Sequence, residues 1–303
     1  MVDENNPLVW ILVLHWRGIE HTRACLASLE RLAYENHRVL LVDNGSDDRD
    51  GETLEAEFPR VSLLTLESNR GFSGGCNAGL EYCLEQQADF IWLLNNDATA
   101  AEDSLSLLVA AADSMPKVGA LSASIVERDE EGRVVSRTGR GIFDFFNAKA
   151  KLKPPAGDEV CECDWLSGAS LLLRAEALKE AGLLNDDYFL YFEDVELSVR
   201  LRYAGWKLLL VPGAEIEHVD GASTGDELRA WRYYYFARNR LYFFSGHPNP
   251  AVKLFCTARV FLHLLRHGLT SPFRGREGRV KLRAEYLAVR DFLGRRTGKV
   301  EYI

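Results

Sequence analysis

The first 125 residues alternate short, dense apolar runs with amphipathic stretches, and this alternation constrains the fold more than any other feature. Four runs rich in Val, Ile and Leu are bounded by polar turns, at 8–14, 39–42, 61–66 and 90–94. Runs of this kind are typical of buried parallel strands. Between them lie helical patterns, as in 19–32, where apolar residues share one face. The alternation predicts an α/β fold, a mostly parallel sheet with right-handed crossovers and helices on both faces.

The pattern changes at about residue 127. Residues 127–162 are polar and contain Pro154-Pro155, so we expect an excursion of hairpin and loop there. The pattern then predicts, in order, a strand at 164–174, a helix at 194–203 ended by Gly205, a strand at 207–211 stopped by Pro212-Gly213, and helices from 226 onward. We therefore expect one large domain over 1–245, in two halves that meet at about 125, and a helical extension over 246–303.

The cysteines and the apolar runs indicate the compartment. The six cysteines are scattered through apolar segments without the spacing of a zinc site, which predicts buried free thiols in a reducing environment. The apolar run 8–14 is too short for a signal peptide and ends in His15. No uncharged stretch reaches the roughly 18 residues that span a bilayer. We expect a cytoplasmic protein.

Charge is unevenly distributed along the chain. Residues 251–303 carry 12 Lys/Arg and 4 Asp/Glu, a net charge of +8. Because the whole chain has a net charge of −9, residues 1–250 carry a net charge of −17. A basic tail on an acidic body favours an anionic membrane surface or a phosphate-bearing acceptor over nucleic acid, which the body would repel. Lys253 and Arg259 lie among apolar residues in 252–265, a pattern suited to peripheral contact with the inner face of the cell membrane. A homodimer interface, a helical cap over the sheet and a solvated tail remain alternatives.

Two acidic stretches carry the chemistry. Asn95-Asn96-Asp97 follows a buried run, which places it at the carboxyl edge of the sheet, where open α/β folds bind ligands. A carboxylate with amide neighbours suits Mg²⁺ or Mn²⁺ held together with phosphate oxygens, although a helix cap is the alternative. His218 follows a short strand and is a candidate third contact to a metal or phosphate, although a lone histidine is usually structural. Glu193 and Asp194 open a helix, where a carboxylate could take a proton.

A glycine-rich loop provides a second kind of site. Residues 69–79 hold four glycines and Arg70 at the start of a predicted helix, where exposed amides and a guanidinium suit a diphosphate. The spacing is neither that of a dinucleotide-binding loop nor that of a P-loop, and close helix–sheet packing is the alternative. Asp43-Asn44-Gly45 ends the second predicted strand, where the acid could bind a base or ribose or could cap a turn.

Taken together, these motifs resemble the family 2 glycosyltransferases, inverting sugar-nucleotide enzymes of the GT-A fold. The similarity is greatest to the rhamnosyltransferase-like branch that builds surface polysaccharides. It extends over about 8–245 and is carried by six motifs in the family's order: Val42–Ser46, Asn69–Gly75 with Asn77, Leu93–Asp97, Trp165–Ala169, Phe189–Leu197 and His218–Ser223. The resemblance implies a nucleotide-binding half over about 1–125 and an acceptor and catalytic half over about 126–245.

The resemblance also assigns the donor site. It implies that Asp43 hydrogen-bonds the nucleotide base while Trp16 packs on the ring, and that Asp97 and His218 hold a divalent metal, Mg²⁺ or Mn²⁺. The remaining nucleotide contacts implied lie in the glycine loop and beside the metal acid: Asn69, Arg70, Gly71, Gly75, Asn77 and Asn96. Two departures from the family's pattern affect this site, Arg17 in place of a small polar residue and amides at Asn95 and Asn96.

For the acceptor side, the resemblance implies that Trp165 and Gly168 shape the pocket. Asp194 would be the general base, with Glu193 as the second candidate. The implied reaction moves rhamnose or another hexose from a dTDP- or UDP-sugar to a saccharide or lipid-linked saccharide. A non-catalytic binding module of the same fold and a sugar nucleotidyltransferase are the alternatives. The acids and His218 argue against the first, and residues 15–18 lack the glycine-rich basic loop that the second requires.

Overall fold

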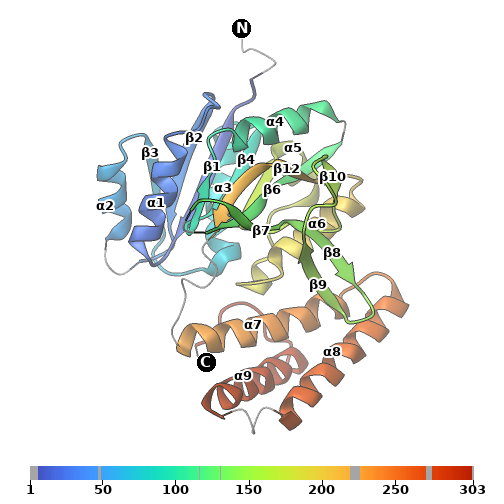
Figure 1. Ribbon diagram of the computed structural model, residues 1–303. Coiled ribbons are helices and arrows are strands. Elements are labelled where there is room, and N and C mark those ends of the chain that lie inside the picture. The colour runs from blue at the N-terminus through green and yellow to red at the C-terminus, as the bar shows by residue number, and fades with distance from the viewer. Residues whose placement is uncertain are drawn as a thin grey trace.

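The computed structural model describes residues 6–46, 49–115, 117–129, 131–218, 226–270 and 275–301. Figure 1 shows an α/β body whose central sheet is flanked by helices, with three long helices beneath it. The alternation in the first half forms the expected elements: β1 (Val9–His15), α1 (Ile19–Leu29), β2 (His37–Asp43), α2 (Asp50–Glu57), β3 (Val61–Thr65), α3 (Gly71–Glu85) and β4 (Phe90–Asn95). Strand β1 pairs in parallel with β2 and β4, and β2 pairs in parallel with β3.

The second half completes a mixed sheet, with strand order β10-β12-β6-β11-β4-β1-β2-β3. Strand β11 lies antiparallel between β4 and β6, whereas β6 and β12 are parallel. The elements are β5 (Ala98–Ala100), α4 (Ser104–Ser114), β6 (Val118–Arg128), β7 (Val134–Thr138), β8 (Arg140–Asp144), β9 (Lys149–Lys153), β10 (Cys161–Glu162), β11 (Ser170–Arg174), α5 (Ala175–Ala181), a 3₁₀ turn (Asp186–Tyr188), α6 (Glu193–Tyr203) and β12 (Lys207–His218). The predicted α/β class, a mostly parallel sheet flanked by helices, is confirmed.

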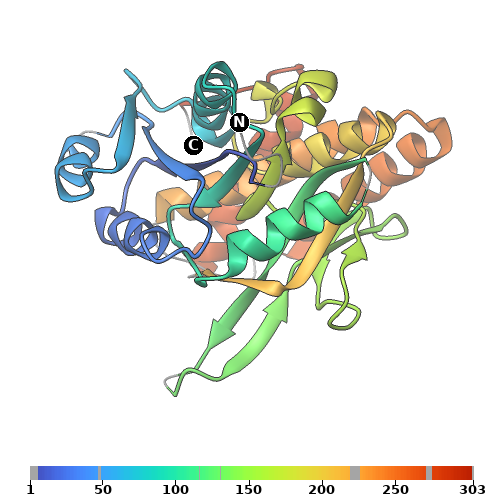
Figure 2. The same ribbon diagram turned by 90° about the horizontal axis from the view of Figure 1, so that it is seen from above.

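The sheet is covered on both faces, because alternate residues of each strand enter different apolar clusters. Val9, Ile11 and Val13 pack with residues of α1 and α4. Trp10 and Leu12, one residue out of phase, pack with residues of α3, α5 and α6 on the other face. Figure 2, seen from above, shows the helices on either side of the sheet. This two-sided burial explains why these strands are apolar throughout instead of alternating with polar residues.

Two predicted strand boundaries are wrong, for different reasons. Strand β12 continues through Pro212-Gly213 to His218, because the proline occupies an irregularity in the pairing with β6 where no N–H is needed. Strand β11 begins at Ser170 instead of 164, because the chain before it is bonded to α6. The N–H of Leu166 donates to Oγ of Ser198 at 3.1 Å, outside any strand ladder.

The three C-terminal helices form a third apolar cluster together with the β8–β9 hairpin and the chain before α6. They are α7 (Asp226–Ser245), α8 (Pro250–Thr270) and α9 (Gly275–Leu293). The predicted start of the extension at 246 falls between α7 and α8, and α7 packs against both later helices and the acidic segment 189–195. Within the described ranges, no helix combines the length and the apolar character needed to cross a bilayer.

Gly141 allows β8 to approach the chain at Trp165 closely. A Cβ at Gly141 would lie 2.0 Å from the main-chain oxygen of Trp165, which cannot move without displacing the segment. We therefore expect Gly141→Ala to lower the free energy of unfolding by about 1–3 kcal/mol. Denaturant titration measures it. Gly157→Ala is the control, because no heavy atom of the described chain lies within 4 Å of a Cβ there. Equal stability of the two variants would contradict the contact.

Candidate active site

The ends of three neighbouring strands meet at one edge of the sheet. In the β1–β2 register His15 lies opposite Asp43, and in the β1–β4 register Leu14 lies opposite Asn95. The residues that follow these strands therefore lie side by side at the carboxyl edge (Figure 1). This is the position that open α/β folds use for ligands, and it holds the residues that the sequence predicted for the donor.

Asp97 and His218 come together because β5 pairs with the end of β12. His218 lies opposite Ala98 in that antiparallel register, so its Nε2 is 3.0 Å from Oδ1 of Asp97 and 3.3 Å from Nδ2 of Asn95. Asp97 Oδ1 is buried, and among the described residues it accepts no hydrogen bond of good geometry. A buried carboxylate oxygen of this kind, beside an imidazole, fits a divalent cation. The residues that follow His218 in its motif lie outside the described residues.

Asp97 and His218 alone do not complete the coordination of a metal ion. Across the ranges that the structure describes, no group of three or more His, Cys, Asp or Glu side chains could hold a metal ion. Asp97 and His218 would supply two ligands, which leaves positions for phosphate oxygens and water. This arrangement is expected where a metal is shared with a phosphorylated ligand.

Asn96 secures the loop after β1. Its Nδ2 donates to the carbonyl of Arg17 at 3.3 Å and to Oγ1 of Thr22 at 2.9 Å. Thr22 also bonds Nδ1 of the buried His15 at 2.8 Å, and Nε2 of that histidine lies 3.2 Å from Asp50. Asn96 thus positions the loop that carries Trp16. Its role as a direct nucleotide contact stays a prediction.

Trp16 is half-buried against an aromatic side chain of α7. Its ring stacks on Trp231 with centroids 5.9 Å apart and planes 6° from parallel. On Trp16 also lies the guanidinium of Arg17, 4.2 Å from the ring centroid. Arg17, the departure from the family's pattern, therefore supports this ring. The sequence did not single out Trp231, which brings α7 to the ring predicted to pack on the base.

The glycine loop is tied to the end of β2 and to the chain before α6. Asn44 donates to the carbonyl of Gly71 at 3.0 Å and accepts from the N–H of Arg70 at 2.9 Å. Oδ1 of Asn69 accepts from the N–H of Gly71 at 2.7 Å. Gly71 has a φ of 75°, and a Cβ there would lie 2.4 Å from the carbonyl oxygen of Phe189. The loop therefore requires glycine at this position, while the side chain of Arg70 is exposed at its edge.

Three other residues predicted to contact the nucleotide have structural partners. The carboxylate of Asp43, 4% exposed, accepts from the N–H and the hydroxyl of Ser46 at 2.8 and 2.9 Å. The amide of Asn77 bonds the backbone of Leu184 at 2.8 and 3.0 Å. Gly75 keeps α3 close to the sheet, as a Cβ there would lie 2.6 Å from Leu14. Nucleotide binding by these residues stays a prediction.

Asp194 and Glu193 begin α6 in different surroundings. Asp194 accepts from the N–H of Gly168 at 2.9 Å and from that of Val195 at 2.7 Å. Burial raises the pKa of Asp194, and these two N–H groups oppose that rise. Glu193 is buried, and its Oε2 has no partner among the described residues. Burial raises the pKa of Glu193 well above its usual value, and the charge of Asp194 raises it further. Of the two side chains, Asp194 is therefore the one whose charged form is stabilised by hydrogen-bond donors.

The two residues predicted to shape the acceptor pocket differ in position. Gly168 lies beside the carboxylate of Asp194, and a Cβ there would lie 3.3 Å from the ring of Phe72. Trp165 is buried in the third cluster, where its indole N–H donates to the carbonyl of Ile142 at 3.3 Å. Gly168 therefore borders the carboxylate of Asp194, whereas Trp165 packs in the core beneath the segment that contains Gly168.

Two polar residues of α7 hold the chain before α6, and the sequence analysis did not single them out. Phe189, Tyr191 and Phe192 have φ values of 62°, 68° and 75°, a conformation that costs energy in residues other than glycine. The amide of Asn239 lies 2.8 Å from each of three carbonyls in this segment, those of residues 188, 190 and 191. Buried Arg238 bonds the carbonyl of Tyr188 at 3.1 Å. The polar run Arg238-Asn239-Arg240 within the aromatic-rich stretch 231–244 was the available signal.

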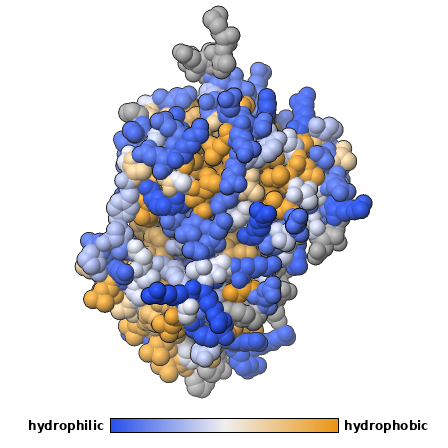
Figure 3. Space-filling view, turned by 180° about the vertical axis from the view of Figure 1, so that it is seen from behind, coloured by the Kyte–Doolittle hydropathy of each residue, from blue (hydrophilic) through white to orange (hydrophobic). Residues whose placement is uncertain are grey.

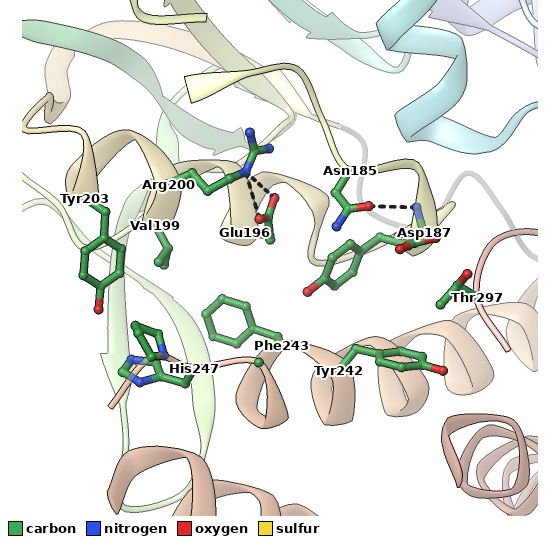
Figure 4. A pocket seen from close by; sticks show the side chains of 13 residues that line it. Asn185, Asp187, Glu196, Val199, Arg200, Tyr203, Tyr242, Phe243, His247 and Thr297 are labelled. Carbon is green, nitrogen blue, oxygen red and sulfur yellow. Dashed lines mark hydrogen bonds and ion pairs between the residues drawn. The ribbon is translucent and has the colours of Figure 1, made fainter. Parts of the chain in front are cut away.

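The other side of α6 borders a pocket of about 380 Å³, shown in Figure 4. Glu196 and Arg200 line it and are paired, with Nε and Oε1 2.8 Å apart. Asp194 precedes Glu196 by two residues, which places it on the opposite side of the helix. Arg200 also bonds the carbonyls of Ala181 and Leu183. The pocket therefore lies on the side of α6 that faces away from the carboxylate of Asp194.

Comparison with known proteins gives a family assignment. Residues 11–171 match the model of "Glycosyl transferase family 2". The N-acetylglucosaminyl-diphospho-decaprenol L-rhamnosyltransferase of Mycobacterium tuberculosis is 31% identical over 235 residues, which are 68% of this chain and 74% of that protein. Galactofuranosyltransferase GlfT1 of the same organism is 24% identical over 198 residues, 64% of either chain.

Solved structures show the same fold at lower identity. GalNAc-T7, in a crystal structure with UDP, GalNAc and Mn²⁺, superposes with a TM-score of 0.60 and 17% identity, over 89% of this chain and 58% of that chain. The mannosyltransferase PcManGT of Pyrobaculum calidifontis, in complex with GDP-Man and Mn²⁺, superposes with a TM-score of 0.58 and 16% identity, over 97% and 77%. The likeness supports the GT-A architecture.

Proposed function

The chain belongs to glycosyl transferase family 2, and from this premise we propose that it is a metal-dependent inverting hexosyltransferase. One observation supports this proposal above others. The segment Gly168-Ala169 bonds both to the strand end beside the candidate metal ligand Asp97 and to the candidate base. The carbonyl of Ala169 accepts from the N–H of Asn95 at 3.2 Å, and the N–H of Gly168 donates to Asp194 at 2.9 Å. The strand end beside Asp97 and the carboxylate of Asp194 are thus held close together, as a single displacement step requires.

In this proposal Asp97 and His218 hold Mg²⁺ or Mn²⁺ together with the diphosphate of the donor. The metal, when bound, offsets the negative charge that develops on the departing nucleoside diphosphate. The exposed guanidinium of Arg70 lies at the same edge and would bind phosphate oxygens, whereas the N–H groups of Gly71 and Phe72 are already bonded to Asn69 and Phe189.

Asp194 acts as general base. Its carboxylate takes the proton from an acceptor hydroxyl while that oxygen forms a bond to the anomeric carbon of the donor sugar. The bond from that carbon to the diphosphate breaks on the opposite face, so the configuration inverts. The N–H groups of Gly168 and Val195 fix the orientation of the carboxylate before the proton moves. Burial disfavours the charged form of Glu193, and its Oε2 has no partner among the described residues, so Glu193 is the weaker candidate for the base.

The relatives indicate the kind of substrate. The relative that is 31% identical is named for transfer of L-rhamnose to N-acetylglucosaminyl-diphospho-decaprenol. This similarity favours a dTDP- or UDP-sugar donor and a lipid-linked saccharide acceptor. A galactofuranosyltransferase at lower identity leaves the hexose open. We place the reaction in the synthesis of cell-surface polysaccharide, on the inner face of the cell membrane.

The surface of α8 supports peripheral contact with a bilayer. Leu254, Leu265 and Leu269 are 76%, 63% and 68% exposed and lie along one side of the helix. Phe255, next in the chain to Leu254, packs on the exposed ring of Phe146 with centroids 6.4 Å apart. Figure 3 shows hydrophobic side chains gathered at the lower left of the molecule seen from behind, where α8 lies. A stripe of this kind on a basic extension suits an anionic interface.

We expect metal-dependent binding of dTDP or UDP, measured by calorimetric titration with UDP, dTDP, GDP and ADP, each with and without Mn²⁺. His218→Ala should weaken the Mn²⁺-dependent binding at least tenfold, because a metal ligand is lost. His37→Ala is the control, since His37 begins β2 at the opposite edge of the sheet. Nucleotide binding that is equally tight without metal and in His218→Ala would contradict the assignment.

We expect Asp194→Asn to reduce transfer by about 10²–10⁴-fold while the donor affinity changes only a few-fold, because the base acts in the transition state. Glu193→Gln, the matched control, should retain transfer. Rates with dTDP-rhamnose and a lipid-linked N-acetylglucosaminyl diphosphate measure both. An active Asp194→Asn protein with an inactive Glu193→Gln protein would reassign the base.

The same assay followed against pH gives a further check on the base. Since burial raises the pKa of Asp194, the acid limb of kcat/KM should lie above the usual carboxyl range of about 4. Activity is lost as the pH falls through that pKa, because the carboxylate takes up a proton and can no longer act as a base. An acid limb at or below the usual value would contradict the buried setting.

We expect the protein to sediment with phosphatidylglycerol vesicles at low salt, and salt to weaken this binding. Leu254→Ser/Leu265→Ser should lower the vesicle affinity about tenfold or more, since each inserted leucine contributes about 1.5–3 kcal/mol. Leu107→Ser/Leu293→Ser removes two exposed leucines elsewhere and should not. Unchanged sedimentation with and without vesicles would overturn the contact. A dimer lost in the first double variant would assign the stripe to a homodimer instead.

A further inference from the structure

A second cavity, of about 340 Å³, lies among the three C-terminal helices and the β8–β9 hairpin. Figure 1 shows β9, α7 and α8 converging there beneath the sheet. Phe192 lines one wall and immediately precedes α6, whose first turn carries Asp194. The cavity is therefore adjacent to the segment that positions the proposed base, on the side away from the nucleotide-binding strands.

The lining of this cavity is strongly basic. Four cationic side chains face it against one carboxylate, that of Glu285, and two histidines complete the polar lining. The cations are Lys149, Arg232, Arg240 and Lys281. The protein as a whole carries a charge of −9, so this concentration of positive charge is local and opposite to the overall sign. Positive charge gathered in a concave site attracts a polyanion.

Arg240 is built into the cavity instead of lying on its surface. Its side chain is 5% exposed, and Nε and Nη2 donate to the carbonyls of Ala148 and Asn147 at 2.6 and 2.7 Å. Because a guanidinium has five N–H donors, these two bonds orient it and leave others for a ligand. Burial lowers the pKa of Arg240 to about 10, and the charge of Glu285 only partly opposes this effect.

The histidines indicate the same shortage of negative charge. Burial lowers the pKa of His263 to about 4, and the nearby charges of His267, Arg240, Lys149 and Lys281 lower it further. Glu285 partly balances these cations, with its Oε1 3.0 Å from Nδ1 of His267 and 3.9 Å from Nζ of Lys281. One carboxylate among four cations leaves room for a second anion.

We propose that this cavity binds the diphosphate of a lipid-linked acceptor. The inference rests on the proposed function and gives the acceptor a defined anion site. A diphosphate carries two or more negative charges and several acceptor oxygens, which matches a fork of Arg240 beside two lysines. The sugar would extend past Phe192 toward Asp194, and the lipid would extend along α8, whose Val260 and Leu264 line the cavity and whose Leu265 belongs to the exposed stripe.

Binding of inorganic pyrophosphate and of geranyl diphosphate, each titrated in EDTA, tests the proposal. EDTA removes the contribution of the metal edge at Asp97. The wild-type protein should bind both, and Lys149→Gln/Lys281→Gln should weaken binding about tenfold or more. Lys153→Gln/Arg283→Gln is the matched control: it removes two positive charges from the same strand and helix, at positions that do not line the cavity. Arg232→Gln, at an exposed lining residue of α7, provides a second variant that leaves the packing intact.

The outcomes separate this inference from the proposed function. Mn²⁺-dependent binding of dTDP or UDP should be unchanged in all these variants, because the donor edge is not altered. Normal donor binding without any pyrophosphate binding, or equal losses in the lining and control variants, would overturn the diphosphate site alone. Pyrophosphate binding without donor binding would overturn the proposed function and keep the anion site. If the lining variants lose binding to phosphatidylglycerol vesicles but not to geranyl diphosphate, the cavity holds a lipid headgroup and the proposal is wrong.

Discussion

The strained segment from Phe189 to Phe192 is the constraint on which the rest of the site depends. Its first carbonyl accepts from the N–H of Phe72 at 2.7 Å and leaves room only for a glycine at position 71. Its last residue immediately precedes α6 and so helps to position Asp194. Positive φ values at three non-glycine residues persist only where the surroundings over-determine them, and Asn239 supplies that restraint from α7. One short segment therefore couples the glycine loop, the carboxylate and the C-terminal helices.

The position of His218 beside Asp97 depends on a different feature, the length of β12. A strand ended at Pro212-Gly213 would leave His218 in a loop, and the irregular pairing with β6 instead lets the strand run on to meet β5. The side chain of His218 then lies beside Asp97 because of backbone pairing, not because the two residues are near in sequence. Of these two features only the segment 189–192 has an unfavourable backbone conformation, and it lies next to the site, where such costs are usually found.

Much of the fold could be predicted from sequence, because parallel strands buried on both faces are apolar throughout. The residues at the ends of β1, β2 and β4 follow from the same pattern. The part that could not be predicted comes from long-range contacts. Nothing near Asn77 indicates that its amide bonds Leu184, and nothing near Trp16 indicates a partner at Trp231. The pattern also suggested a stop at Pro212, since proline lacks an N–H, whereas the irregular pairing does not need one.

The role of the C-terminal helices follows from α7, whose opposite sides serve two sites. Trp231 and Tyr235 pack on Phe189, and Trp231 also stacks on Trp16 at the donor edge. Other residues of the same helix, Arg232 and Arg240 among them, line the basic cavity. In the proposed reaction α7 would therefore set the distance between donor and acceptor, on which a displacement depends. The predicted extension over 246–303 packs against α7 and so contributes to the support of the segment that precedes Asp194.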